Sequence, residues 1–172
     1  MDLEAASDSE ADWPRDQTDT LAGALRVARA DLVAHLGGAW RRFDFDLWPF
    51  EGRLPSEVVA STLWFESGEP TQVLLGIVES ANFEPDIAVV AFPEFVMIDW
   101  RTRYLPSREQ ARIDISQPGS LVRLQGAVAE VALRRRKSFF WCRTCRTCNP
   151  PEDRSEPGIC FGCSVQYFGA IP

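Results

Sequence analysis

Residues 139–172 read FFWCRTCRTCNPPEDRSEPGICFGCSVQYFGAIP and contain all five cysteines of the 172-residue chain. Two C-x-x-C pairs separated by a polar, proline-rich loop have the spacing of a four-thiolate zinc site. Two residues between thiols allow a tight turn to present both sulfur atoms on one side, where the backbone N–H groups of the turn face the thiolates. This stretch therefore predicts a small cysteine-rich module, residues 138–172, that folds around a metal ion.

The first half of this stretch leaves two ligand pairs open, because Cys142, Cys145 and Cys148 are evenly spaced. Pairing Cys142 with Cys145 places the turn directly after an apolar strand at residues 138–141, and we favour this pairing. Pairing Cys145 with Cys148 places Asn149, which tolerates a positive φ, where such turns often have glycine. The predicted ligands are therefore Cys145, Cys160, Cys163 and Cys142, with Cys148 as the alternative to Cys142.

The predicted metal is zinc. Three cysteines in the pattern C-x-x-C-x-x-C with a remote fourth also bind iron–sulfur clusters, so a cluster is the alternative. The second pair, Cys160 and Cys163, favours zinc, since zinc uses both thiols of this pair and a cluster leaves one unused. A four-thiolate zinc site has no open coordination position, so we expect the metal to stabilise the fold and to take no part in a reaction.

The two cysteine pairs resemble those of zinc-ribbon and treble-clef modules, and the resemblance covers about residues 138–172. In treble-clef modules the second pair lies at the start of a short helix, which would correspond here to residues 163–168. Members of this broad class bind nucleic acids or proteins, so the resemblance implies a metal-stabilised binding module without fixing its partner. For residues 1–137 we identify no such resemblance.

Basic residues gather in the same part of the chain. Residues 134–172 contain seven Arg and Lys and three acids, a net charge of +4, whereas the whole chain carries −7. This asymmetry favours an anionic partner at the C-terminal end, and nucleic-acid phosphates are the partner we expect. The alternative is a helix C-terminus stabilised by its dipole, with cations that offset the thiolate charge. The candidate contact residues are Arg134, Arg135, Arg136, Lys137, Arg143 and Arg146.

Residues 16–137 predict an α+β body, built from helices and several strands. Apolar positions at helical spacing predict one helix over residues 16–36 and another over residues 120–137. The residues Leu54-Pro55-Ser56 open a third, shorter helix, with Ser56 or Pro55 in its first turn, that is predicted to end at about Phe65.

The strands of the body are predicted from alternating or β-branched sequence, at residues 41–50, 71–78, 87–92 and 95–100. The last two runs are separated by Pro93, and they form either a hairpin or one bent edge strand. Residues 1–15, rich in Asp, Glu and Ser, predict a disordered acidic arm.

The sequence predicts no catalytic residues, because His35 is the only histidine and no glycine-rich phosphate loop is present. No apolar run approaches the roughly 18 residues of a membrane span, and the first residues lack the features of a secretory signal. We therefore expect a cytoplasmic protein with reduced thiols. Its expected function is non-enzymatic binding or regulation, with the C-terminal module contacting nucleic acid or its associated machinery. The alternatives are an enzyme or ligand-binding body braced by structural zinc, and a protein–protein adaptor.

Overall fold

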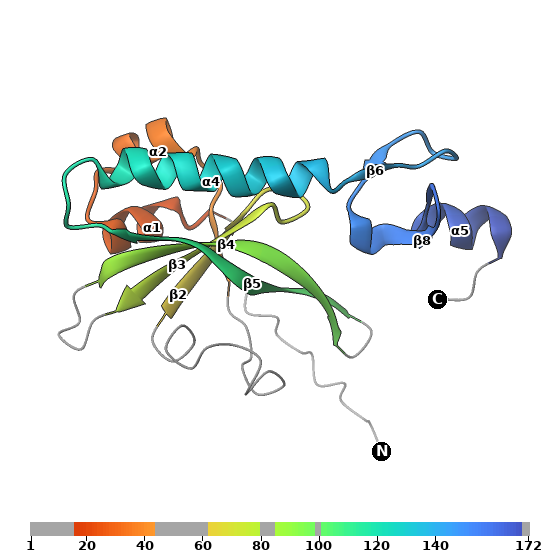
Figure 1. Ribbon diagram of the computed structural model, residues 1–172, viewed down its shortest axis with the longest axis horizontal. Coiled ribbons are helices and arrows are strands. Elements are labelled where there is room, and N and C mark those ends of the chain that lie inside the picture. The colour runs from red at the N-terminus through yellow and green to blue at the C-terminus, as the bar shows by residue number, and fades with distance from the viewer. Residues whose placement is uncertain (1–15, 44–61, 80–84, 99–100, 170–172) are drawn as a thin grey trace, which may run out of the picture.

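A computed structural model describes residues 16–43, 62–79, 85–98 and 101–169. Three helices lie on one face of a five-stranded antiparallel sheet (Figure 1): α1 (Thr18–Leu25), α2 (Arg29–Leu36) and α4 (Ser120–Lys137). The strands follow one another across the sheet in chain order: β1 (Arg41–Phe43), β2 (Thr62–Ser67), β3 (Val73–Glu79), β4 (Pro85–Ile98) and β5 (Arg101–Asp114). The α+β class predicted from the sequence is confirmed.

Beyond the C-terminal end of α4, the chain forms two short hairpins and a final helix (Figure 1). The first hairpin pairs two-residue strands, β6 (Phe140–Trp141) and β7 (Cys148–Asn149). A 3-10 turn, η2 (Pro151–Asp153), leads to the second hairpin, of β8 (Arg154–Glu156) and β9 (Ile159–Cys160), on which α5 (Phe161–Phe168) packs. Residues 138–169 are termed the C-terminal module below.

The main core lies between the helices and the sheet. Leu124 and Val131 of α4 are buried in one cluster with Leu75, Ile77 and Val90 of the central strands. The apolar residues of α4 recur at helical spacing, so a helix presents all of them to the sheet at once. Burial of this stripe, more than helix propensity, accounts for the stability of α4.

The central strands are buried on both faces. Val73 and Leu75 face the helices, whereas the intervening Leu74 belongs to a second cluster with Trp64 and Val89 on the opposite face. Successive side chains of a strand point to opposite faces, so a strand covered on both sides needs a continuous apolar sequence. This explains the uninterrupted apolar run at the start of β3.

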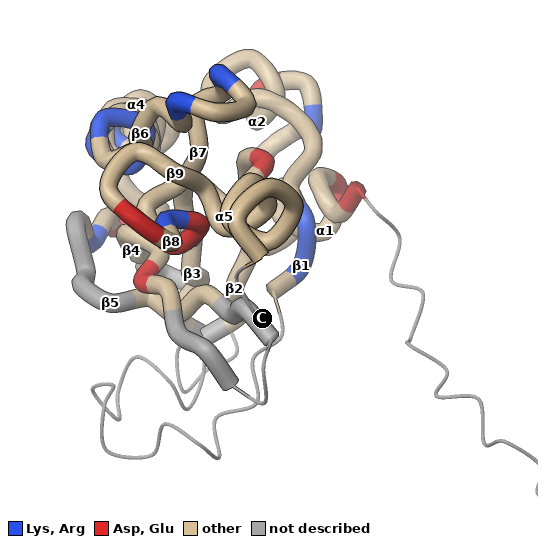
Figure 2. Tube along the Cα trace, turned by 90° about the vertical axis from the view of Figure 1, so that its right-hand side faces the viewer, with Lys and Arg blue, Asp and Glu red and all other residues tan. Residues whose placement is uncertain are grey.

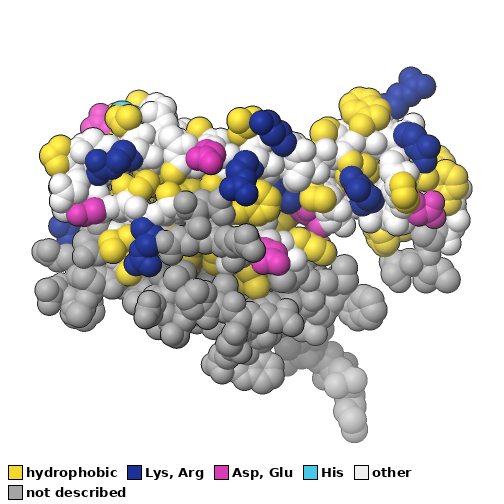
Figure 3. Space-filling view, in the orientation of Figure 1, with side chains coloured by type: hydrophobic (Ala, Val, Ile, Leu, Met, Phe, Trp, Pro, Cys, Tyr) yellow, Lys and Arg dark blue, Asp and Glu magenta, His cyan; other side chains and the backbone are white. Residues whose placement is uncertain are grey.

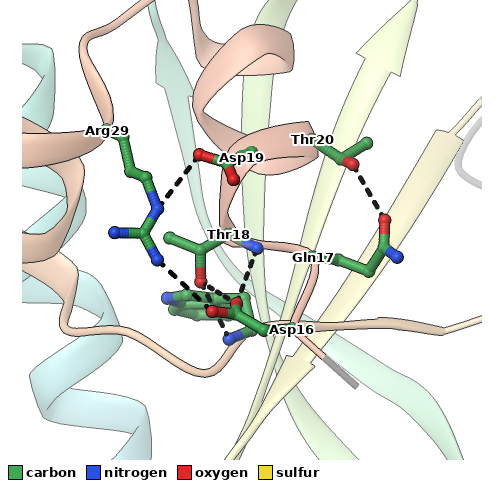
Figure 4. Close-up of polar contacts among 7 residues, drawn as sticks. Asp16, Gln17, Thr18, Asp19, Thr20 and Arg29 are labelled. Atoms are coloured by element: carbon green, nitrogen blue, oxygen red, sulfur yellow. Dashed lines mark hydrogen bonds and ion pairs between the residues drawn. The ribbon is translucent and has the colours of Figure 1, made fainter. Parts of the chain in front are cut away.

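Polar contacts fix the start of the first helix (Figure 4). The carboxylate of Asp16 accepts hydrogen bonds from the hydroxyl of Thr18 and from its backbone N–H, at 2.9 Å, and these bonds lower the pKa of Asp16. Arg29, the first residue of α2, forms ion pairs with Asp16 at 3.4 Å and with Asp19 at 3.0 Å. The starts of the two helices are thereby held together.

The prediction of one helix over residues 16–36 is wrong, because α1 and α2 are separate helices. Arg26 adopts the left-handed conformation, with φ of 57°, and ends α1. The short helix predicted to reach Phe65 is also wrong at its end, since residues 62–65 lie in β2. Phe65 is fully buried there, and such packing overrides local preference.

The two runs on either side of Pro93 form a single strand, β4, so the predicted hairpin is wrong and one bent strand is correct. The bend coincides with register shifts beside Val90 and Phe92. This strand is not at the edge, because it pairs with β3 on one side and β5 on the other. Residues 101–114, for which the sequence predicted no element, form β5.

The strand predicted at residues 71–78 and the helix predicted at 120–137 are confirmed as β3 and α4. The strand predicted at residues 41–50 is confirmed for its first three residues, and its remainder lies outside the described residues. The acidic arm and the start of the predicted short helix lie outside them as well, and a domain boundary near residue 138 stays a prediction. Among the described residues, no helix has the length and apolarity to cross a bilayer.

Candidate metal centre

Four cysteine sulfur atoms meet within the C-terminal module. The Sγ atoms of Cys142, Cys145, Cys160 and Cys163 all lie within 4.8 Å of one another, and those of Cys145 and Cys160 are 3.8 Å apart. A metal ion bound tetrahedrally to four thiolates at about 2.3 Å separates neighbouring sulfur atoms by roughly 3.8 Å. These four side chains are therefore positioned to bind a metal ion with only small shifts of their sulfur atoms.

The first cysteine pair lies in a tight turn between β6 and β7. The backbone N–H of Cys142 donates to the carbonyl of Thr147 at 2.9 Å, and the N–H of Arg146 donates to the carbonyl of Cys142 at 3.0 Å. Arg146, directly after Cys145, adopts the positive φ of 57° that closes this turn. The residue with positive φ that such a turn needs directly after its second cysteine is therefore Arg146, after Cys145, and not Asn149, after Cys148.

Cys148 is not part of the sulfur cluster. It lies in β7 opposite Trp141, and its side chain is exposed. Of the two cysteines between which the sequence left a choice, the structure thus brings Cys142 into the cluster.

The second cysteine pair is placed by the start of α5. Cys160 directly precedes the helix, and Cys163 is its third residue. The N–H of Arg143 donates to the carbonyl of Gly158 at 2.9 Å, which joins the first turn to the second hairpin. A Cβ atom at Gly158, whose φ is +77°, would lie 2.8 Å from Nε of Arg143. The positive φ therefore favours glycine at this position, and a larger residue would also displace the side chain of Arg143.

Burial and hydrogen bonding act in opposite directions on the thiols. Burial raises the pKa of Cys142, but hydrogen bonds from backbone N–H groups, including that of Cys160 at 3.4 Å, outweigh it and lower the pKa to about 6. The hydroxyl of Thr147, 2.9 Å from Sγ of Cys145, lowers the pKa of that thiol. Burial and the neighbouring thiols raise the pKa of Cys163 to about 12.

The four thiols cannot all ionise without a cation. Four negative charges within 4.8 Å repel one another strongly, and burial makes the repulsion worse. A bound divalent ion removes this penalty and deprotonates its thiol ligands. The chemistry of the donor set is therefore that of a soft metal site.

A buried ion pair joins the module to the body. The guanidinium of Arg135, near the end of α4, pairs with the carboxylate of Glu152 in η2, and the two side chains are 2% and 3% exposed. Glu152 also accepts a hydrogen bond from the hydroxyl of Tyr104 at 2.8 Å, and Nε of Arg135 donates to the carbonyl of Thr71 at 3.3 Å. Three ring centroids lie 5.4–5.9 Å from the guanidinium, those of Phe92, Tyr104 and Phe139.

Tyr104 remains a hydrogen-bond donor in this network at any physiological pH. Burial raises the pKa of its phenol, and the hydrogen bond to Glu152 raises it further. The carboxylate of Glu152 therefore keeps two partners, a cation from α4 and a hydroxyl from β5.

Arg135 is a correction to the predicted nucleic-acid surface, because a buried arginine paired with Glu152 is not available to a phosphate. The spacing of residue 135 from the apolar residues of α4 could have predicted this burial. Residue 135 follows the buried Val131 by four residues and so continues the apolar stripe of α4. The other predicted contact residues are exposed: Arg134, Arg136, Lys137, Arg143 and Arg146.

A cavity of about 820 Å³ opens at the same junction. Residues 92–95 of β4 line one side, and Pro151, Glu152 and Arg154 of the module line the other. This cavity was not predicted, because its walls lie far apart in the sequence.

Comparisons of the chain with protein families, with curated proteins and with solved structures find no match. The functional proposal below therefore rests on the geometry of the cysteine cluster and of its surroundings.

Serine substitutions separate the four clustered cysteines from the fifth. Cys163→Ser removes a thiolate from the cluster, so purified protein should contain much less metal than the roughly one ion per chain expected of the unaltered protein. Cys148→Ser is the matched control and should retain the metal. Elemental analysis of both variants measures this, and metal loss from Cys148→Ser alone would contradict the assignment.

The buried ion pair has a measurable effect on stability. Glu152→Ala leaves Arg135 buried without a counter-charge, and breaking a buried pair in this way costs about 3–5 kcal/mol of the free energy of unfolding. Glu156→Ala removes an exposed carboxylate nearby and should cost less than about 0.5 kcal/mol. Denaturant unfolding followed by circular dichroism compares the two. Equal, small effects would show that the pair does not hold module and body together.

Proposed function

We propose that this protein is a zinc-binding, non-enzymatic binding or regulatory protein whose C-terminal module contacts nucleic acid. The observation on which the proposal rests is the cluster of four thiols within 4.8 Å, formed by Cys142, Cys145, Cys160 and Cys163. Soft thiolate ligands in a tetrahedral arrangement suit zinc, and four of them leave no open position for a substrate. The metal therefore has a structural role.

The size of the cluster supports a single ion over an iron–sulfur cluster. A cluster attaches its cysteine ligands to different iron atoms and so needs sulfur atoms further apart than those of a mononuclear site. Here all four sulfur atoms lie close enough to share one ion. Zinc is the ion we propose, since it has no preference that would distort a tetrahedral site.

The order of elements supports a treble-clef module over a zinc ribbon. The first pair lies in the turn of one hairpin, a second hairpin follows, and the last pair flanks the start of helix α5. The apolar core around the cysteines is small, with Phe140 buried and Ile159 partly buried. We infer that metal binding supplies most of the folding free energy of residues 138–172, which we regard as a separate unit.

The distribution of charge supports nucleic acid as the partner. Figure 2 shows basic positions at the end of α4 and in the β6–β7 hairpin, and acidic positions grouped around β8. Four thiolates with one divalent ion carry −2, so residues 134–172 would change from +4 to +2 on metal binding. The exposed cations Arg136, Lys137, Arg143 and Arg146 thus remain in excess on their side of the module.

A second candidate function is ligand binding by the body, and the cavity at the junction is the observation that favours it. Its volume of about 820 Å³ is within the range of small-molecule sites. In this case the metal would brace one wall of the cavity through Glu152.

The metal itself is tested by elemental analysis of purified protein, which should find about one zinc per chain. The sample should be colourless, because zinc has a filled d shell. A brown protein that contains iron and sulfide would contradict the zinc assignment and show that the four cysteines bind an iron–sulfur cluster.

Nucleic-acid contact is tested by Arg146→Gly. Glycine keeps the left-handed backbone of the turn, so the metal should stay bound while one exposed cation is lost. If Arg146 contacts a phosphate, binding should weaken, and the slope of log affinity against log salt should fall by about 0.7–0.9. Titrations of labelled oligonucleotide at several salt concentrations measure this slope.

Arg26→Gly is the matched control, because Arg26 is also an exposed arginine with φ of 57° but lies on the body. It should leave both affinity and salt slope unchanged. If the two variants have the same affinity and the same salt slope, Arg146 does not contact nucleic acid.

A further inference from the structure

Four aromatic side chains of the C-terminal module are exposed. Trp141 and Tyr167 are each 60% exposed, Phe168 is 62% exposed and Phe161 is 43% exposed. Large apolar rings are normally removed from water, as Trp40 is in the core of the body. So many exposed rings on one small module mark a surface that a partner covers.

Two of these rings lie beside the cysteine cluster. Trp141 directly precedes Cys142 and Phe161 directly follows Cys160, and the N–H of Cys160 lies 3.4 Å from Sγ of Cys142. Trp141 and Phe161 are therefore each the sequence neighbour of a residue that takes part in this contact. Cys142 and Cys160 are buried and the rings are exposed, so the rings point outward around the cluster.

Helix α5 extends this surface with a continuous stripe. Phe161, Val165 and Phe168 follow at intervals of four and three residues, which places them on one face of the helix. All three are exposed, while Cys163 on the other side of the helix is buried. The stripe begins at the metal cluster and runs to the end of α5.

The module that carries the exposed rings also carries exposed cations. Arg143 directly follows Cys142, and Arg146 directly follows Cys145. Like Trp141 and Phe161, these two residues are therefore next to clustered cysteines in the sequence. Arg143 is held in place because its Nη2 donates to the carbonyl of Pro157 at 3.0 Å. Figure 3 shows basic and hydrophobic side chains interspersed on the visible face of the module.

We propose that this surface binds single-stranded nucleic acid, with unpaired bases stacked on Trp141 and on the rings of α5, and phosphates held by Arg143 and Arg146. The inference rests on the proposed nucleic-acid contact and specifies the form of nucleic acid. Stacking needs bases whose faces are accessible, which single strands offer and duplexes do not. A duplex partner would explain the cations but not the rings, and an apolar protein partner would explain the rings but not the cations.

The test uses the metal-loaded full chain and fluorescently labelled oligo-dT, oligo-U and mixed duplex of about 12 nucleotides. At least one of the single strands should bind about tenfold more tightly than the duplex. Trp141→Ala should weaken single-strand binding about tenfold, because one stacking platform is lost, and Trp141→Phe should restore most of it. Comparison of oligo-dT with oligo-U shows whether the strand is DNA or RNA.

Val122→Ala is the control, since Val122 is also 60% exposed but lies on α4 of the body, and it should bind as the unaltered protein does. Bound zinc and circular dichroism confirm that each variant is folded. Equal binding of strand and duplex, unaffected by Trp141→Ala, would overturn the stacking inference and leave nucleic-acid contact intact. Absence of binding to all three probes would overturn both, and the rings would then face a protein.

Discussion

A charged guanidinium can be buried only if its charge is matched, and this requirement organises the junction of the structure. Arg135 is placed by α4 against the sheet, and its counter-charge, Glu152, comes from η2 in the C-terminal module. The tyrosine hydroxyl from β5 is a second partner of the same carboxylate oxygen, Oε1. Replacing both partners of such a pair by apolar residues often costs nothing, whereas removing one partner leaves a buried charge and is costly. One polar network thereby fixes how the helix, the strand and the module meet.

The cysteine cluster and the aromatic surface depend on each other through the same few residues. Three of the four clustered cysteines are buried, and the aromatic residues directly beside Cys142 and Cys160 are exposed. The module is too small to cover those neighbours with a core of its own. The cysteine cluster thus determines which side chains surround it, and we assign the proposed binding to those side chains and not to the metal.

Sequence reasoning succeeded where the determining contacts are local and failed where they are distant. The spacing of the cysteines and the periodicity of α4 are both local signals, and both features are present. The break at Arg26 carried no signal, because arginine has no preference for the left-handed conformation that ends α1 there. β5 has a largely polar sequence, and its pairing with β4 is what makes it a strand. Arg135 looked like a surface cation because its partners, Tyr104 and Glu152, are contributed by other elements.

Arg135 and Glu152 are 17 residues apart, so Arg135 is synthesised before its partner. The ribosome completes the sheet and α4 before it makes η2, and segments that emerge first begin to fold first. Until the module forms, the guanidinium at the end of α4 lacks its carboxylate. If metal binding folds residues 138–172, as proposed above, the supply of metal would then set when Glu152 reaches Arg135.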